Sequence, residues 1–136
     1  MKRKFLEEQS GFSITELLVV LVIIGVLILL ALPRLLPVVT KAKSTEAKLN
    51  LKQVLMLQKS FKYENDRYTS SLSEIGFEQE TLITDGGSAR YKIEIAESDL
   101  NAFKATATAV VDFDNDGTFN IWEVSQDGQI KEVVPD

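Results

Sequence analysis

This chain of 136 residues contains no cysteine and no histidine. Without cysteine it can form neither a disulfide bond nor a thiolate metal site, and without histidine it lacks the usual general base near neutral pH. Proline is scarce, at three residues, and tryptophan occurs once. Because no other catalytic arrangement of side chains is visible in the sequence, we expect that the protein is not an enzyme.

The net charge of −5 at pH 7 is distributed unevenly along the chain. Lysines outnumber acidic residues between positions 41 and 64, whereas residues 99–136 contain eight acidic residues and two lysines. An acidic outer part repels phosphate groups, so the sequence does not indicate a nucleic-acid partner. The length corresponds to about one domain, and much of it is committed to an apolar segment.

A long apolar run occupies residues 12–32, and its only polar side chains are Ser13, Thr15 and Glu16. As a helix rising about 1.5 Å per residue, it spans roughly the 30 Å of a bilayer core and can cross a membrane. It is longer than the core of a secretory signal, which has about 7–15 residues, and no A-x-A-like cleavage site follows it. A basic leader precedes the run and places the N-terminus in the cytoplasm by the positive-inside rule. A plain signal anchor also explains these features.

Glu16 is the one charged residue of this run and a candidate functional residue. An ionisable side chain inside a membrane helix costs about 3 kcal/mol on insertion scales, so its presence calls for an explanation. A local alternative exists, because Ser13 and Glu16 match the S-x-x-E capping box, in which the two side chains satisfy backbone amides at a helix start.

The motif at the start of the apolar run consists of a basic leader ending in Gly11, then Phe12, Thr15 and Glu16, and an unbroken apolar helix that reaches Pro33. This arrangement resembles the class III signal of type IV pilins and pseudopilins. The resemblance implies that a prepilin peptidase cuts between Gly11 and Phe12 on the cytoplasmic side, and that Phe12 becomes an N-methylated N-terminus. It also implies that Glu16 pairs with the N-terminal amine of a neighbouring subunit, because opposite charges leave water together more cheaply than either alone.

The apolar pattern becomes amphipathic beyond residue 37, and we expect one long helix to continue to about Tyr63. Its broad apolar face, which fits against a sheet, comprises Ala47, Leu51, Val54, Leu55, Gln58 and Phe61. A narrower seam with seven-residue spacing comprises Ala42, Leu49 and Met56. This seam either contacts neighbouring helices in an assembly or belongs to a single wide core face.

Gly25, Pro33 and Pro37 are candidate breaks in this helix. Proline removes an amide donor and clashes with the preceding turn at a cost of about 3 kcal/mol, and glycine costs about 1 kcal/mol. We therefore expect a kink between Gly25 and Pro37 in the membrane subunit. The resemblance implies that the stretch from Gly25 to Pro33 unwinds in filaments.

Residues 91–95 and 103–111 alternate apolar and polar side chains, as half-buried antiparallel strands do. Residues 120–124 and 129–134 flank the dipeptide Asp127-Gly128, which is a typical hairpin turn. The predicted fold is α+β and type IV pilin-like: a long N-terminal helix, membrane-spanning in its first half and amphipathic in its second, packs on a small antiparallel sheet. We expect a leader at 1–11, a transmembrane or filament-core helix half at 12–37, an amphipathic helix half at 38–64, and a globular head with an αβ-loop at 65–136.

The segment DFDNDGTFNIWE matches the calcium-loop pattern D-x-D-x-D-G-x5-E. Its candidate Ca²⁺ ligands are Asp112, Asp114, Asp116, Thr118, Asn120 and Glu123. Strand-like flanks do not fit an EF-hand, and Asp-rich turns without metal are common because Asp and Asn cap their own backbone. Adjacent acids nevertheless repel one another, and a calcium ion would relieve that repulsion. The resemblance implies that such a site replaces the disulfide that many pilins carry; we expect no other cofactor.

We therefore expect a structural subunit of a type IV pilus, which assembles with copies of itself into a helical homopolymer. The resemblance implies further partners, namely prepilin peptidase, the pilus assembly machinery and, before assembly, membrane lipid. It implies a location in the bacterial inner membrane before assembly and in an extracellular pilus afterwards. Two alternatives stay open. One is a type II secretion pseudopilin, although the chain lacks an Asp-Pro-Trp-Gly type segment, and the other is a signal-anchored extracytoplasmic binding module that does not polymerise.

Overall fold

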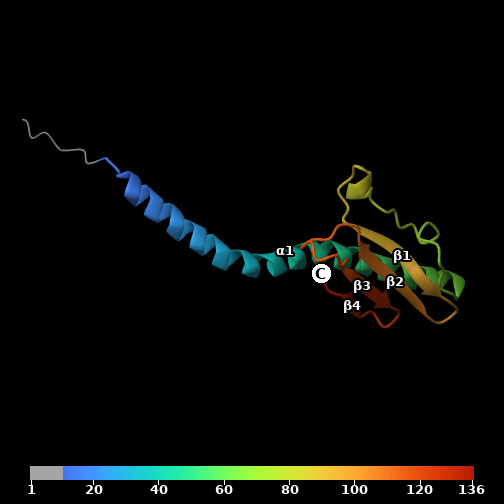
Figure 1. The fold of residues 1–136 in the computed structure, drawn as a ribbon. Helices are drawn as coiled ribbons and strands as arrows, with labels where there is room; N and C mark the ends of the chain where they lie inside the picture. The colour runs from blue at the N-terminus through green and yellow to red at the C-terminus, as the bar shows by residue number, and fades with distance from the viewer. Residues whose placement is uncertain (1–10) are drawn as a thin grey trace, which may run out of the picture. The chain divides into compact units, whose positions relative to one another are not determined.

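A computed structural model describes residues 11–136 of the chain, so the predicted leader lies outside the described residues except for Gly11. The elements follow in the order α1 (Ile14–Asn65), the short 3₁₀-helix η1 (Ile83–Asp85), β1 (Tyr91–Ser98), β2 (Phe103–Ala109), β3 (Ile121–Ser125) and β4 (Ile130–Val134) (Figure 1). The chain divides into two compact units, with the boundary between Leu36 and Pro37.

The first unit consists, in its described part, of the apolar beginning of α1. It contains enough consecutive apolar residues to cross a membrane, by length and composition. α1 keeps its helical conformation through Gly25, Pro33 and Pro37, and because a helix can bend at a proline without losing that conformation, the kink expected between Gly25 and Pro37 stays a prediction. A proline removes a single amide donor, while the residues on either side keep their own hydrogen bonds and the surrounding leucines favour a helix. The unwinding that the resemblance implies for filaments stays a prediction.

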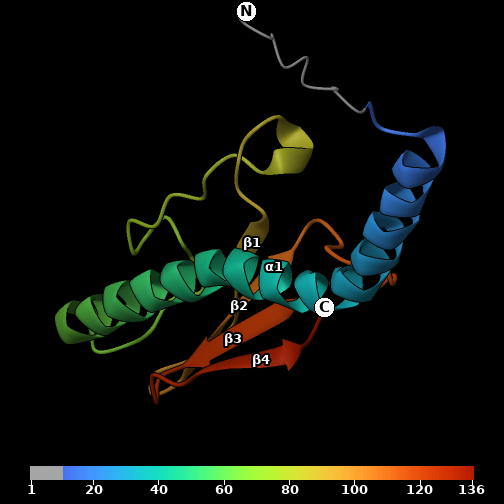
Figure 2. The same ribbon diagram turned by 90° about the vertical axis from the view of Figure 1, so that its left-hand side faces the viewer.

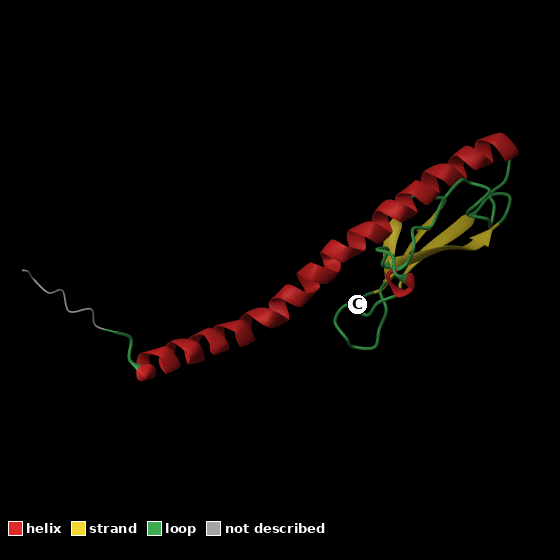
Figure 3. Ribbon diagram, turned by 90° about the horizontal axis from the view of Figure 1, so that it is seen from above, coloured by secondary structure: helices red, strands yellow, loops and turns green. Residues whose placement is uncertain are grey.

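The second unit contains a four-stranded antiparallel sheet in the order β1-β2-β3-β4, each strand paired with the next along the chain. The end of α1 lies along one face of this sheet (Figures 2 and 3). The β3–β4 connection turns at Gly128, whose backbone φ of 80° favours glycine, and the Gly128 amide donates to the Ser125 carbonyl at 2.9 Å. The predicted α+β fold and the predicted strands are confirmed.

The core of this unit lies between α1 and the sheet. The helix contributes the buried side chains of Ala47, Leu51 and Val54, which belong to the face that the sequence predicts. The sheet contributes alternate residues of β2, which are alanines apart from Phe103, together with larger side chains from β1 and β3. The buried sheet residues are Tyr91, Ile93, Phe103, Ala105, Ala107, Ala109 and Val124.

The predicted second seam of α1 is not part of this core. Leu49 is 63% exposed and Met56 is 60% exposed, whereas Gln58 on the core face is fully buried. Gln58 donates from Nε2 to the Thr69 carbonyl at 2.6 Å and accepts from the Thr69 amide at 3.3 Å, which ties the αβ-loop to the helix. The structure therefore favours two separate apolar faces over one wide core face.

Candidate assembly and ion-binding sites

The first turn of α1 holds Glu16 by the capping box that the sequence indicates. Glu16 Oε2 accepts hydrogen bonds from the Ser13 amide and the Ser13 hydroxyl, both at 2.9 Å. In return, the Ser13 hydroxyl oxygen accepts from the Glu16 amide at 3.2 Å. Both side chains are exposed, so the carboxylate stays accessible to a partner while Ser13 fixes its position.

The apolar side chains that follow Glu16 are uncovered within the described part of the chain. From Leu17 to Leu36 the large aliphatic side chains are exposed, for example Leu29 at 70%. A continuous apolar surface of this extent is unfavourable in water and marks a surface that contacts lipid or other protein. Gly11 and Phe12, the residues of the predicted cleavage bond, are exposed directly before this helix.

The acidic loop, residues 112–118, joins β2 to the region before β3 and is closed by its own carboxylates. Asp112 accepts from the Asn115 amide at 2.6 Å and from the Gly117 amide at 2.7 Å. Asp116 accepts from the Thr118 amide at 2.6 Å. These bonds are the Asx-type turns typical of Asp-rich loops, and they account for the loop's shape without a metal.

The same loop brings three of the predicted calcium ligands together. One carboxylate oxygen from each of Asp112, Asp114 and Asp116 lies within 4.8 Å of the others. The Gly117 amide holds the pKa of Asp112 below its ordinary value. In contrast, the pKa of Asp114 is raised, first by desolvation and then by the negative charges of Asp116, Asp136 and Asp112. A cation among these oxygens would remove that repulsion.

The three other predicted ligands, Thr118, Asn120 and Glu123, do not belong to this group of carboxylates. Glu123 is a β3 residue and is not a member of the carboxylate group, while Thr118 is bonded to Asp116 through its amide. Asn120 is fully buried, and its Oδ1 accepts from the Tyr91 hydroxyl at 2.7 Å and from Trp122 Nε1 at 2.6 Å. Its side-chain amide is therefore occupied by protein partners.

Asn120 is the centre of a buried hydrogen-bond network that sequence reasoning missed. Its Nδ2 donates to Glu132 Oε1 at 2.8 Å and to the Val134 carbonyl at 2.9 Å, so a single side chain joins β1, β3 and β4. Desolvation raises the pKa of Tyr91, and the acids nearby raise it further. No local sequence signal marks this role, because the partners lie up to 29 residues away along the chain.

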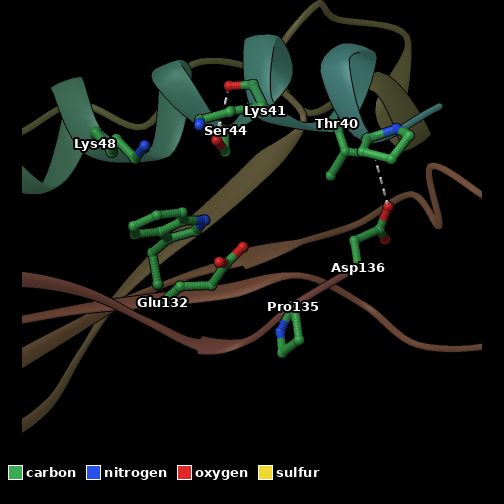
Figure 4. A pocket seen from close by; sticks show the side chains of 9 residues that line it. Thr40, Lys41, Ser44, Lys48, Glu132, Pro135 and Asp136 are labelled. Atoms are coloured by element: carbon green, nitrogen blue, oxygen red, sulfur yellow. Dashed lines mark hydrogen bonds between the residues drawn. The ribbon is translucent and has the colours of Figure 1, made fainter. Parts of the chain in front are cut away.

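A pocket between α1 and the end of β4 contains charges of both signs (Figure 4). Thr40 Oγ1 donates to Asp136 at 3.3 Å, which fastens the segment after β4 to the helix. Lys48 Nζ lies 4.2 Å from the centre of the Trp122 ring. Asp136 also accepts from the Phe113 amide at 3.2 Å, so the segment after β4 connects the acidic loop with α1.

Comparisons with known proteins agree with this arrangement. A family model described as the prokaryotic N-terminal methylation motif matches residues 8–32. The chain is 38% identical over 102 residues to the type IV major pilin protein PilA of Myxococcus xanthus, covering 75% of this chain and 44% of that protein. It is 36% identical over 64 residues to the type II secretion system core protein G of Pseudomonas aeruginosa, covering 47% of this chain and 45% of that protein. The matched regions span less than half the length of these curated relatives.

The fold, the methylation motif and the relatives together confirm the predicted resemblance to type IV pilins and pseudopilins. Like these proteins by resemblance, the chain combines a long apolar N-terminal helix with an antiparallel sheet. Both relatives are named as structural or secretion-system components and neither as an enzyme, in agreement with the expectation that this chain is not an enzyme.

Proposed function

We propose that this chain is a structural subunit of a type IV pilus. The observation that carries the proposal is the uncovered apolar helix with a single carboxylate, Glu16, exposed in its first turn within the methylation motif. Before assembly the helix spans the bacterial inner membrane with the N-terminus in the cytoplasm, in contact with lipid and the assembly machinery. After assembly the subunit is part of an extracellular pilus, a helical polymer of copies of this chain.

In this proposal Glu16 pairs with the N-terminal amine of a neighbouring subunit. A buried carboxylate without a partner is costly, and an amine of opposite charge offsets much of the desolvation of both groups. Ser13 already holds one carboxylate oxygen, so the capping box orients Glu16 without preventing a second contact. The exposed seam with Leu49 and Met56 supports helix packing further along α1.

The proposal requires cleavage between Gly11 and Phe12 by a prepilin peptidase and methylation of Phe12. We expect electron microscopy of sheared cell-surface material to show thin filaments, and mass spectrometry of their subunit to give an N-terminus at methylated Phe12. Gly11→Leu should leave the leader attached and abolish the filaments, whereas Gly25→Ala, a glycine change within α1 and away from the cleavage bond, should be processed normally. Filament subunits that still begin at Met1 would refute the proposal.

A second candidate function is that of a type II secretion pseudopilin, which the similarity to core protein G favours. The two candidates predict different phenotypes when the gene is deleted. Loss of surface filaments with normal protein secretion supports the pilus subunit, and a secretion defect without loss of surface filaments supports the pseudopilin. A subunit that is never cleaved and never assembles would instead support a signal-anchored binding module.

We also propose that the acidic loop binds Ca²⁺. Three clustered carboxylates supply the oxygen ligands that this hard cation prefers, and like charges whose oxygens lie within 4.8 Å of one another favour a cation between them. Asp112, Asp114 and Asp116 would hold the ion. Asn120 is not one of the proposed ligands, because its buried side-chain amide already bonds to Tyr91, Trp122 and β4.

Calcium at ten times its dissociation constant should stabilise the folded protein by about 1.4 kcal/mol. We expect the midpoint of thermal unfolding of the full chain in detergent to rise with Ca²⁺ and to fall back with chelator.

Asp114→Asn should remove the calcium response yet raise the midpoint in chelator, because a group with a raised pKa destabilises the fold when it ionises. Asp112→Asn should lower the midpoint at neutral pH, since a depressed pKa stabilises the fold until the pH falls through it. A wild-type midpoint indifferent to calcium would show that the loop is only a turn.

A further inference from the structure

The sheet of the second unit has two edge strands among the described residues, β1 and β4. An edge strand presents backbone N–H and C=O groups with which a strand of another chain can pair. In an antiparallel sheet only every second residue bonds to a given neighbouring strand, so the residues between them direct their backbone groups outward. In β1, Tyr91 and Ile93 are outward residues, because their backbone groups bond to side chains outside the sheet.

The β4 edge has several features that discourage pairing with another strand. It is five residues long, its pairing with β3 contains a register shift, and Lys131 lies within it while Pro135 directly follows it. β1 is longer, with eight residues, and its own register shift lies late, between Ile95 and Glu97. The first half of β1 is therefore a regular edge that needs another form of protection.

Gln79 closes the middle of this regular half from the αβ-loop, residues 66–90. Its Nε2 donates to the Tyr91 carbonyl at 3.2 Å, and its Oε1 accepts from the Ile93 amide at 2.9 Å. Nε2 also donates to the Glu80 carbonyl at 3.0 Å, and the side chain is half-buried. A carboxamide presents a donor and an acceptor as a peptide group does, so this single side chain makes two bonds that a fifth strand would otherwise supply.

The helix and the loop close the beginning of the same edge. Glu46 of α1 accepts from the Tyr91 amide at 3.2 Å. The Ala89 carbonyl accepts from the Ile83 amide at 2.8 Å, and the Ala89 amide donates to the Thr81 carbonyl at 3.1 Å. The outward backbone groups at the start of β1 thus bond to α1 and the αβ-loop in place of a fifth strand.

We propose that Gln79 protects the β1 edge and thereby prevents β1 of one copy from pairing with β1 of a second copy. The Tyr91 carbonyl and the Ile93 amide, which Gln79 occupies, are the groups that a second strand would need. The inference goes beyond the proposed function and does not rest on it, because it concerns the single subunit before any assembly.

The sequence of β1 suits pairing with a copy of itself once the edge is open. A two-fold pairing centred on Lys92 places Tyr91 of each copy opposite Ile93 of the other. Arg90 then lies opposite Glu94, and opposite charges across a strand pair are favourable. The two Lys92 residues face each other at a non-hydrogen-bonded position, where Cα atoms are about 4.5 Å apart. Two cysteines at that separation can form a disulfide.

The absence of native cysteine allows a direct test by disulfide formation in the full chain in detergent. Lys92→Cys alone should remain mostly monomeric under oxidising conditions, because Gln79 still covers the edge. In Gln79→Leu/Lys92→Cys, where leucine makes neither bond, the disulfide-linked dimer should increase at least about fivefold on non-reducing gels. The matched control Gln53→Leu/Lys92→Cys changes an exposed glutamine of α1 and should resemble Lys92→Cys alone. Gln79→Leu/Lys131→Cys, with the thiol on β4, should give no dimer.

Gly87 allows a second way to open the edge. A Cβ at this position would overlap the Thr81 carbonyl oxygen, so Gly87→Ala should displace the loop from Ala89. Adding Gly87→Ala to Gln79→Leu should therefore increase the dimer further, because both attachments of the loop to the β1 edge are then weakened.

Hydrogen exchange of the Ile93 amide measures the protection itself. Gln79→Leu should speed this exchange at least about tenfold, because the amide loses its acceptor. Gln79→Glu keeps an acceptor and adds a charge at the edge, so the exchange should stay slow and the chain should stay monomeric. The Gly128 amide, which bonds within the β3–β4 turn, should exchange at the same rate in all three proteins.

Three results would overturn the inference. If exchange at Ile93 accelerates but the dimer does not increase in either opened variant, Gln79 only attaches the loop. If Lys131→Cys forms the dimer and Lys92→Cys does not, the protected edge is not β1. If Gln79→Leu changes neither quantity, its bonds protect nothing. None of these results depends on filaments, so failure of the inference and failure of the proposed function are distinguishable.

Discussion

Glu16→Gln should reduce the yield of surface filaments by at least about tenfold, while the subunit remains in the membrane at its normal level. Glutamine keeps the shape of the side chain and can still accept from Ser13, but it carries no charge with which to hold a neighbour's amine. Immunoblots of the sheared and membrane fractions measure the two quantities separately. Glu16→Ala should show the same defect, because it lacks both the charge and the acceptor.

Ser13→Ala distinguishes assembly from helix capping. It removes the hydroxyl that donates to Glu16 Oε2 at 2.9 Å and leaves the carboxylate in place. If the charge of Glu16 is what matters, Ser13→Ala should assemble with only a small loss of yield. A defect in Ser13→Ala as large as that of Glu16→Gln would assign the role to the capping box, and normal yield in Glu16→Gln would exclude the pairing.

Asn120→Ala should destabilise the head by about 3 kcal/mol and lower the midpoint of thermal unfolding by more than about 10 °C. The substitution leaves the buried Tyr91 hydroxyl without its acceptor and removes the bonds that hold Glu132 and the Val134 carbonyl. Thermal unfolding of the full chain in detergent, followed by circular dichroism, measures the effect. Gln129→Ala, an exposed change before β4, serves as the control and should be nearly neutral.

Asn120→Asp separates the acceptor role from the donor role. Aspartate can still accept from Tyr91 and Trp122, but it cannot donate to Glu132, and its negative charge would lie beside that carboxylate. We therefore expect this variant to be less stable at neutral pH than in mild acid, where one of the two carboxyls is protonated. A neutral effect of Asn120→Ala would show that the network contributes little to the stability of the head.

Local pattern was sufficient for the elements of this fold. The apolar run determines the first part of α1, the alternation at Tyr91–Ser98 and Phe103–Ala109 indicates β1 and β2, and Asp127-Gly128 marks the turn between β3 and β4. The capping box of Ser13 and Glu16 and the clustering of the three aspartates are local as well, since their partners lie within a few residues. Short-range spacing decides such features, so a single sequence contains them.

Tertiary structure decided what each local feature contacts. The sequence spacing predicted that Asn120 is a ligand in a metal-binding loop. In the structure its buried side chain instead bonds to the Tyr91 hydroxyl of β1 and to the Val134 carbonyl of β4, which are distant in sequence. Spacing also left two interpretations for Leu49 and Met56, and the position of the sheet shows that this seam is uncovered. The sequence by itself therefore determined the elements, the capping box and the acidic loop, while only the tertiary structure decided which side chains are buried together, because burial depends on contacts between segments far apart along the chain.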